Sequence, residues 1–342
     1  MTWFKATDFN GKYIFSSNKK LTKMCIETLN MERIPKGTLL LANTKKFGKL
    51  AIAGKDCYIG SGVMALMTDE SVCLSEYLYY FLEKNSLLIS KGVKSSDILD
   101  LEIKLPDIES QEKIVKALVD TERLIEINNE HFNLQQNLIF NRFENLYYNI
   151  KKSLEIQTIE NAGLEVVDYY GRGGGHRIAQ RVEEGDYAYV VTVSSLKCDY
   201  SDFKMVTKST YDFFKKVQLK GGEIIISNIG TPGQVFKCPD IDKPMILGPN
   251  CIMIKKNKYN DFLFLFFKSS FGKNAMESIT GGSAQPKFNK TNFKKISIAF
   301  PSNYNLKKFK ELYREYASLC SNFNTEEEYL TSIKKSIYIK IL

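Results

Sequence analysis

The residues of this sequence that are best suited to chemistry are arginines, lysines and one glutamine, which occur in three segments that contain glycine or lie beside it. Arginine pairs with guanine edges, a glutamine amide pairs with adenine, and lysine pairs with phosphates. Glycine lets the backbone approach a phosphate closely. These residue types therefore predict non-covalent contact with nucleic acid. The candidate contact residues are Arg172, His176 and Arg177 in one segment, Gln285, Lys287 and Lys290 in another, and Lys45, Lys46 and Lys49 in the third.

Each segment also has a simpler interpretation. Residues 171–177 fit a flexible surface loop, because their glycines form neither a Walker motif nor a dinucleotide fingerprint. A solvated turn explains the residues around Gln285 nearly as well. The lysines from Lys45 to Lys49 suit phosphates better than bases.

No catalytic, cofactor or metal site is predicted. His131 falls on the apolar side of an expected long helix, where a packed histidine is a better interpretation than a general base. No serine or cysteine lies in a recognisable nucleophile motif. The seven cysteines show no CxxC pair and no regular spacing with the two histidines, which argues against structural zinc and favours reduced thiols. With no signal-peptide pattern and no apolar run long enough for a membrane span, we expect a cytoplasmic protein.

The charge and the composition narrow the partner. The 342 residues allow two domains, and a hydrophobic content of 44% excludes a disordered chain. The net charge is +9, and the basic residues exceed the acidic ones in two regions, 1–106 and 153–301, but not between them. This distribution fits two polyanion-binding domains on a neutral spacer, although lysine-rich surfaces are also common in proteins that bind no polyanion.

A long internal repeat indicates a duplicated domain. Residues 3–9 are echoed by 190–196, and residues 36–43 by 221–228. Both copies contain short β-rich runs separated by Gly, Asn and Asp turns. Each copy also contains an aromatic stretch, 76–83 or 261–268, whose periodicity fits either a strand or a buried helix. We predict a short helix, because Ser75 or Asn260-Asp261 would serve as its N-cap.

Two longer stretches have helical periodicity. Apolar residues recur on one helical face over 109–152, at positions that include Leu118, Leu124, Leu138 and Phe143, and again over 306–341. Thr121, Asn128 and Gln135 fall on the first of these seams at intervals of seven residues, where polar side chains fix coiled-coil register. We predict an antiparallel coiled coil, which would place the two domains at opposite ends. In the alternative arrangement each helix packs only on its own domain.

The predicted fold class is α+β, with two similar mixed α/β domains joined by long helices. The predicted boundaries are 1–106 for the first domain, 107–152 for the central helix, 153–301 for the second domain and 302–342 for the C-terminal helix.

Three segments resemble the specificity subunits of type I restriction-modification systems. Leu-Pro-Asp-Ile-Glu-Ser-Gln-Glu-Lys-Ile-Val at 105–115 is similar to the start of that family's central helix. Gly-Gly-Ser-Ala-Gln-Pro-Lys-Phe-Asn-Lys at 281–290 resembles its glycine-rich Gln-Pro loop, and Ile-Ser-Asn-Ile-Gly-Thr-Pro-Gly-Gln-Val at 226–235 resembles its Gly-Thr turn. Their order and duplication extend the resemblance over nearly the whole chain.

The resemblance implies a non-catalytic subunit. Two target-recognition domains would each contact one half of a bipartite double-stranded DNA target, with the helices setting their spacing. The subunit would bind two adenine-methyltransferase subunits and, in the full assembly, ATP-dependent restriction subunits. Enzyme activity would belong to those partners.

The first domain departs from the family pattern. The second copy has about 35 residues, 153–187, ahead of the segment that the first copy reaches almost at once. The N-terminal recognition domain is therefore predicted to be shortened, and self-association of two chains is one way to complete it. The alternatives to DNA recognition are an adaptor that gathers proteins without reading DNA, an inactive remnant and, more weakly, a nuclease or methylase with an unfamiliar site.

Overall fold

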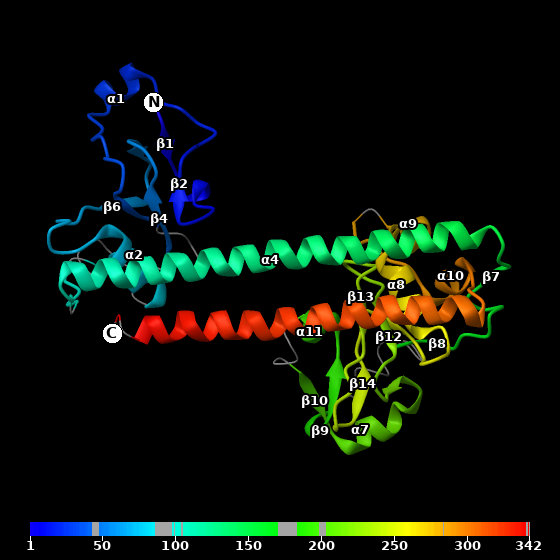
Figure 1. Ribbon diagram of the computed structural model, residues 1–342. Helices are drawn as coiled ribbons and strands as arrows, with labels where there is room; N and C mark the ends of the chain where they lie inside the picture. The colour runs from blue at the N-terminus through cyan, green and yellow to red at the C-terminus, as the bar shows by residue number, and fades with distance from the viewer. Residues whose placement is uncertain are drawn as a thin grey trace. The chain divides into compact units, whose positions relative to one another are not determined.

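The structure is a computed structural model that describes residues 1–42, 48–85, 98, 100–103, 105–169, 183–197, 203–282, 284–339 and 341. The chain forms two compact units (Figure 1). The first unit contains Met1–Glu130 and Phe323–Leu342, and the second contains His131–Asn322. Two long helices, α4 (Ile108–Lys151) and α11 (Asn303–Ile339), each contribute one stretch to both units.

The first unit is built on a four-stranded sheet. Its other elements are β1 Trp3–Phe4, η1 Ala6–Asp8, β2 Tyr13–Ile14, α1 Lys23–Thr28, β3 Leu39–Ala42, β4 Lys49–Ala53, β5 Tyr58–Ile59, β6 Val63–Leu66 and α2 Ser75–Lys84. The sheet has the order β2-β4-β3-β6, and β3 is antiparallel to both of its neighbours. Strands β1 and β5 form a separate parallel pair.

The second unit contains two four-stranded sheets, ordered β13-β12-β15-β8 and β10-β9-β14-β11, and the pair β16-β7. Its elements are β7 Ile156–Thr158, β8 Val166–Asp168, β9 Glu184–Val191, α6 Val193–Lys197, β10 Lys204–Val206, α7 Lys208–Phe213, η3 Lys215–Val217, β11 Gln218–Leu219, β12 Ile224–Ser227, β13 Val235–Lys237, β14 Met245–Leu247, β15 Cys251–Ile254, α8 Asn260–Lys268, α9 Ser270–Ser278, α10 Lys290–Lys294 and β16 Ser297–Ala299.

The strand registers confirm the predicted duplication. In both units a central strand, β3 or β12, pairs antiparallel with the next strand along the chain and with a later one, and a short helix, α2 or α8, follows. The parallel pair β1–β5 likewise corresponds to the parallel pair β9–β14. The equivalent positions are Leu39, Ile52 and Leu66 in the first unit and Ile224, Lys237 and Ile254 in the second.

Two strands distinguish the two four-stranded sheets. The sheet of the second unit ends in β8, which pairs with β15, whereas the sheet of the first unit ends in β2, which pairs parallel with β4. In the described part of the first unit, β6 has no neighbour equivalent to β8 and forms an edge of the sheet. Strand β8 comes from the segment ahead of the repeat, which agrees with the shorter first copy seen in the sequence.

Both aromatic stretches form the short helices that we predicted, but their predicted N-caps are wrong. Ser75 and Asn260 are the first helical residues, and the N-cap positions belong to Leu74 and Tyr259, which form no capping bond through their side chains. Ser75 instead donates its hydroxyl to the Glu70 carboxylate at 2.6 Å. The Asn260 amide donates to a backbone carbonyl. Tertiary contacts therefore take up the polar groups that a local cap would use.

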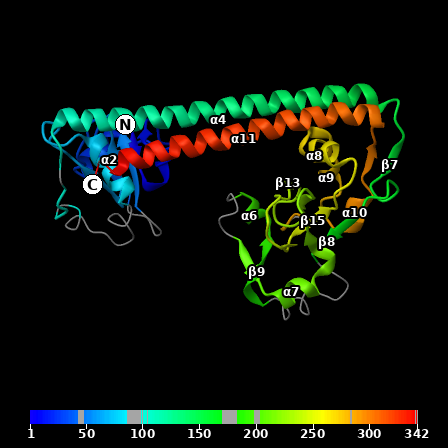
Figure 2. The ribbon, with the colours of Figure 1, turned by 60° about the horizontal axis from the view of Figure 1, so that its bottom comes forward.

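The core of the second unit is centred on α8, whose residues 262–267 are all buried. A helix that is apolar all round needs neighbours on every side. Figure 2 shows α8 between the β13-β12-β15-β8 sheet and the two long helices. Phe143 of α4 contacts Phe262 of α8 and Phe309 of α11, with ring centroids 6.1 and 5.2 Å apart.

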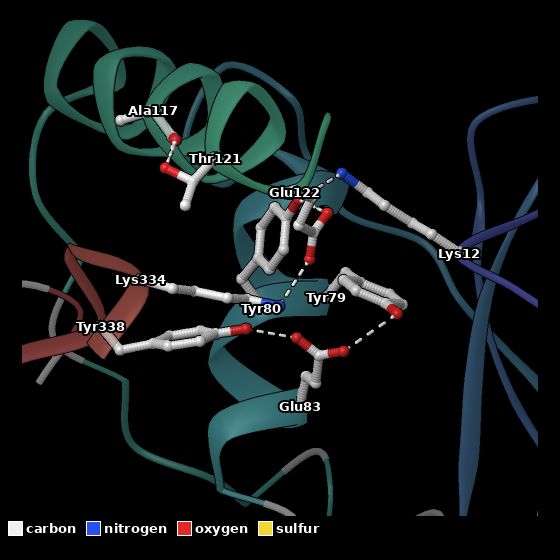
Figure 3. Close-up of polar contacts among 9 residues, drawn as sticks. All are labelled: Lys12, Tyr79, Tyr80, Glu83, Ala117, Thr121, Glu122, Lys334 and Tyr338. Carbon is white, nitrogen blue, oxygen red and sulfur yellow. Dashed lines mark hydrogen bonds and ion pairs between the residues drawn. The ribbon is translucent and has the colours of Figure 1, made fainter. Parts of the chain in front are cut away.

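In the first unit, α2 joins the two long helices through a polar network (Figure 3). Glu122 of α4 accepts hydrogen bonds from the Tyr80 hydroxyl at 2.7 Å and from the Lys334 ammonium group at 2.8 Å. Glu83 of α2 accepts a hydrogen bond from Tyr338 of α11. Burial of the Tyr80 phenol, and then its bond to Glu122, raises its pKa. This phenol therefore stays protonated and keeps its role as a donor.

The two long helices pack antiparallel, as predicted, and each unit shows this separately. In the second unit Phe140 contacts Tyr316 while Phe143, further along, contacts Phe309. In the first unit Val115 and Leu118 share a core cluster with Ile341, near the end of the chain. The fold is thus α+β, with two similar mixed domains and paired long helices.

The predicted polar seam residues do not connect the two helices. The Thr121 hydroxyl is buried but donates to Ala117 of its own helix at 2.7 Å, and the exposed Gln135 bonds to His131 of its own helix. His131 is exposed, so its predicted packing is also wrong. Ion pairs make the polar connections instead, and one of them joins Arg142 to Glu315 at 2.5 Å.

The described cysteines are free thiols. Cys57, Cys238 and Cys251 are buried, Cys25 is exposed, and the described residues contain no disulfide. Burial raises the pKa of the Cys57 and Cys251 thiols to about 11.

Within the described ranges, no helix combines the length and the apolar character needed to cross a membrane.

Candidate nucleic-acid interface

Two turns of the second unit meet and form one surface. The first follows β12, and the second leads from α9 to α10. The Gly230 N–H donates to the Pro286 carbonyl at 3.1 Å, and the Phe288 N–H donates to the Asn228 carbonyl at 3.0 Å. The Asn228 side-chain amide donates back to the Phe288 carbonyl at 3.2 Å. Two motifs that lie more than fifty residues apart in the sequence are therefore neighbours in the fold.

The turn between α9 and α10 is narrow and presents Gln285. Gly281 and Lys287 exchange backbone hydrogen bonds of 2.9 Å. Gly282 has a φ of +95°, and a Cβ there would lie 2.7 Å from the Gln285 carbonyl oxygen. Only glycine fits this position without strain. The Gln285 and Lys287 side chains are exposed, and no ion pair of the described residues involves Lys287. An amide and an ammonium group are thus free to meet a ligand.

Lys290 is held more firmly than Lys287. Its ammonium group lies 2.7 Å from the Asp168 carboxylate, and the two side chains are 35% and 22% exposed. Because this ion pair partly neutralises the lysine charge, Lys290 is better suited to holding the turn in place than to binding a phosphate by itself. Asp168 ends β8, and the chain then runs through Tyr169 toward the predicted arginine loop. Arg172, His176 and Arg177 lie outside the described residues.

A hollow of about 430 Å³ lies between these turns. Asp168, Lys287 and Lys290 line it together with Asn228, which is only 8% exposed. The Asn228 side-chain oxygen is buried and accepts no hydrogen bond from the described residues. The described lining contains no serine, cysteine or histidine. Its groups can donate and accept hydrogen bonds, which is the chemistry of recognition.

The predicted lysine turn of the first unit is described only in part. Lys49 begins β4 and is exposed, and its ammonium nitrogen lies 3.4 Å from the Phe9 carbonyl oxygen. Lys45 and Lys46 lie outside the described residues. Of the predicted contact residues, the structure thus describes Gln285, Lys287 and Lys290 in the second unit and Lys49 in the first.

Comparison with known proteins identifies the family. The family model for the type I restriction modification DNA specificity domain matches residues 2–137 and 165–333. These two stretches cover most of the chain and include both copies of the repeat. The chain belongs to the type I restriction-modification DNA specificity family. In this specificity-family protein, each of the two similar domains lies within one of the two stretches that match the family model.

Two relatives illustrate how far the likeness extends. The type I restriction enzyme MjaIX specificity subunit of Methanocaldococcus jannaschii is 26% identical over 176 residues, which span 48% of this chain and 40% of that protein. The crystal structure of a type I restriction-modification S subunit from M. genitalium aligns with a TM-score of 0.52 at 15% identity, covering 100% of this chain and 88% of that one. The second likeness shows a shared fold.

The specificity-family motif at 105–115 has a structural role in this chain. Gln111 is fully buried in the first turn of α4. Its amide oxygen accepts from the Leu74 N–H at 3.0 Å, and its amide nitrogen donates to the carbonyls of Val72 and Pro106, both at 2.8 Å. This side chain thus pairs the backbone N–H of Leu74, the N-cap residue of α2. The motif fastens the start of the long helix to the recognition domain.

The sequence did not indicate two residues of the surface that the two turns of the second unit form. Asp168 lies 122 positions before its partner Lys290 and stands in no motif. Asn228 lies within the matched Gly-Thr turn but was not singled out, although it ties the two turns together. The only signal for Asn228 was its place between a buried strand and a glycine turn, where Asn is common for conformational reasons alone.

Proposed function

We propose that this chain is the DNA sequence-recognition subunit of a type I restriction-modification complex. Its two domains bind the two halves of a split double-stranded DNA target. It has no catalytic role and assembles with adenine-methyltransferase subunits and, in the full complex, with restriction subunits. Family membership supports the recognition role, and duplication supports two half-sites, because tethered domains gain affinity only when their spacing matches the target.

The observation that carries this proposal is the surface formed by the two turns of the second unit. It exposes an amide and an ammonium group on a turn braced by backbone hydrogen bonds and by an ion pair. A rigid turn of this kind loses little conformational entropy on binding. The Gln285 amide suits an adenine edge, and Lys287 suits a phosphate beside it.

The decisive experiment maps methylated adenine across the genome of cells that express this chain with its methyltransferase and restriction subunits. Cells that lack the chain serve as the comparison. We expect a split motif that disappears when the chain is absent. Methylation that is unchanged in those cells would reject the recognition role, and a single contiguous motif would reject the two-domain arrangement.

Substitutions in the turn separate base reading from phosphate contact. Gln285→Ala should lower methylation of the parent motif about tenfold and relax one base in one half-site, because one bidentate base contact contributes about 1–3 kcal/mol. Lys287→Ala should weaken binding to all duplexes alike. Lys273→Ala is the matched control, since Lys273 is exposed on α9 and lies outside this surface. A parent motif that survives Gln285→Ala unchanged would remove Gln285 from the reading of bases.

The outer surface of α4 supports the proposed binding of methyltransferase subunits. In the second unit Leu134 and Leu138 are 68% and 60% exposed, and in the first unit Leu124 and Ile127 are 52% and 50% exposed. Leucines four residues apart lie on one helical face. Exposed apolar side chains at helical spacing are typical of a surface that a partner helix covers.

Charge placed on this helical face should block assembly without unfolding the chain. Leu134→Glu combined with Leu138→Glu is expected to abolish co-purification with the methyltransferase subunit. Because both leucines are largely exposed, the free energy of unfolding should change by less than about 0.5 kcal/mol per site. Asn133→Glu combined with Asn137→Glu adds the same two charges at neighbouring exposed positions and should preserve the complex. Full complex formation by the double variant would place the docking surface elsewhere.

A further inference from the structure

Five lysines surround a second hollow in the second unit, of about 330 Å³, at the N-terminal end of α8. They come from β13, from the loop between β15 and α8, and from the first turns of α11. One acidic residue, Asp261, shares the lining. The lysines are Lys237, Lys256, Lys258, Lys307 and Lys310. None of them was predicted as a contact residue, and none lines the hollow beside Gln285.

Among the described residues, one of these five lysines has a carboxylate partner. Lys237 lies 3.0 Å from the Asp261 carboxylate and 3.8 Å from the ring centroid of Tyr313. The other four are exposed, and no ion pair among the described residues involves them. Like charges that converge on one hollow repel one another, and a bound anion removes this repulsion.

The backbone around the hollow also favours an anion. Helix α8 has nine residues, and no side chain caps its N-terminus. Its first N–H groups therefore add a partial positive charge. The Asn260 amide donates to the Gly222 carbonyl at 2.6 Å, which ties the helix to the turn before β12. Gly222 has a φ of +82°, and a Cβ there would lie 3.5 Å from the Lys256 ammonium nitrogen. Lys256 thus lies directly across this turn.

The first unit shows that the fold does not require these lysines. The equivalent hollow, of about 590 Å³, lies at the start of α2 and is lined by Lys36, Glu70 and Glu76 among others. The strand registers put Ile52 at the position of Lys237. Thr68 follows β6 as Lys256 follows β15. The two equivalent hollows therefore differ in charge. Among the described residues, only the hollow of the second unit is lined by a cluster of lysines.

We infer that the lysine hollow of the second unit binds a phosphate group, and that the DNA backbone supplies it. This inference rests on the proposed function. The hollow would hold the duplex by charge without reading its sequence, while the turn with Gln285 reads bases. A second, sequence-independent contact in the same unit fixes the register of the duplex on the domain.

The test compares the full chain with the double variant Lys256→Gln, Lys307→Gln. Binding of a duplex carrying the target and of a scrambled duplex is measured by fluorescence anisotropy from low to high salt. We expect both duplexes to bind the variant more weakly, and the slope of log affinity against log salt to fall by about 1 for each phosphate that the variant no longer neutralises. Lys308→Gln is the control, because Lys308 is exposed on the same turn of α11 but does not line the hollow.

A second arm identifies the source of the phosphate. Thermal melts of the full chain are recorded with pyrophosphate and with sulfate. An unchanged salt slope in the double variant, with stabilisation by pyrophosphate that the variant loses, would replace DNA by a free phosphate compound. If the double variant keeps both the salt slope of the parent chain and its stabilisation by pyrophosphate, the inference is wrong. If Lys287→Ala lowers duplex binding while the double variant does not, the proposed function stands and the lysine hollow has no part in it.

Discussion

Replacing Gln111 by leucine is expected to destabilise the first unit by about 1–3 kcal/mol. Leucine fills a similar volume but removes the partner of three partly buried backbone groups: the Leu74 N–H and the carbonyls of Val72 and Pro106. A buried polar group left unpaired costs about 1–3 kcal/mol. The change should therefore lower the melting temperature by several degrees.

The only tryptophan in the sequence makes this prediction easy to measure. Trp3 belongs to the first unit, so its fluorescence follows that unit and not the second. Glu112→Leu is the matched control, because Glu112 is the next residue of the same helix, belongs to the first unit and is exposed. We expect the control to melt like the parent chain. A Gln111→Leu transition within about 1 °C of the parent would show that these hydrogen bonds contribute little to stability.

Much of the fold follows from local sequence. The buried strands Leu39–Ala42 and Ile224–Ser227 read as continuous apolar runs before glycine or asparagine turns, so the repeat was visible without the structure. Spacing alone allowed the aromatic stretches to be strands or helices, and the helix prediction rested on N-caps that the structure does not contain. At the start of α2 the Leu74 N–H instead donates to Gln111, 37 residues later. Contacts between residues so far apart in the sequence produce no periodic pattern in it.

The face that α4 buries was predicted only in part. Phe143 and Leu118 are fully buried, but Leu124 and Leu138, which lie on the same predicted seam, are exposed. No residue from 122 to 138 is buried. Six and twenty residues after Leu118, Leu124 and Leu138 lie on roughly the opposite side of the helix, and the buried stretches of α4 are those that also pack with α2 or α8. Periodicity marks an apolar face, whereas burial depends on neighbours that the pattern does not contain.

The candidate interface was predicted in the same uneven way. Gln285 and Lys287 were found from residue type and glycine spacing, and both side chains are exposed. The ion pair between Lys290 and Asp168 was not foreseen, because the partner stands in a separate strand. The lysine hollow was missed for a related reason. Its five members come from three segments that are far apart in the sequence, and nothing in the sequence shows that the lysine-rich runs 255–258 and 307–310 meet.

Phe143→Ala should destabilise the second unit by about 3–5 kcal/mol, the usual cost of removing a buried phenylalanine. Phe143 has no exposed surface and contacts Tyr147 of α4, Phe262 of α8 and Phe309 of α11. It therefore joins both long helices to the recognition domain. The cavity left by alanine removes packing from all of these elements at once. We expect hydrogen exchange to become faster throughout α8 and β12.

Tyr148→Ala is the matched control for this change, since it removes an aromatic ring from the next turn of the same helix, where the side chain is 51% exposed. It should alter stability by less than about 1 kcal/mol, because half of the side chain is exposed and the charged ends of Lys151 and Lys152 lie over its ring. Hydrogen-exchange mass spectrometry of the full chain resolves the two outcomes segment by segment. Equal protection of α8 in both variants would mean that Phe143 does not fasten α4 to the domain. Selective loss of protection in Phe143→Ala would show that the helices and the recognition domain share one cooperative core.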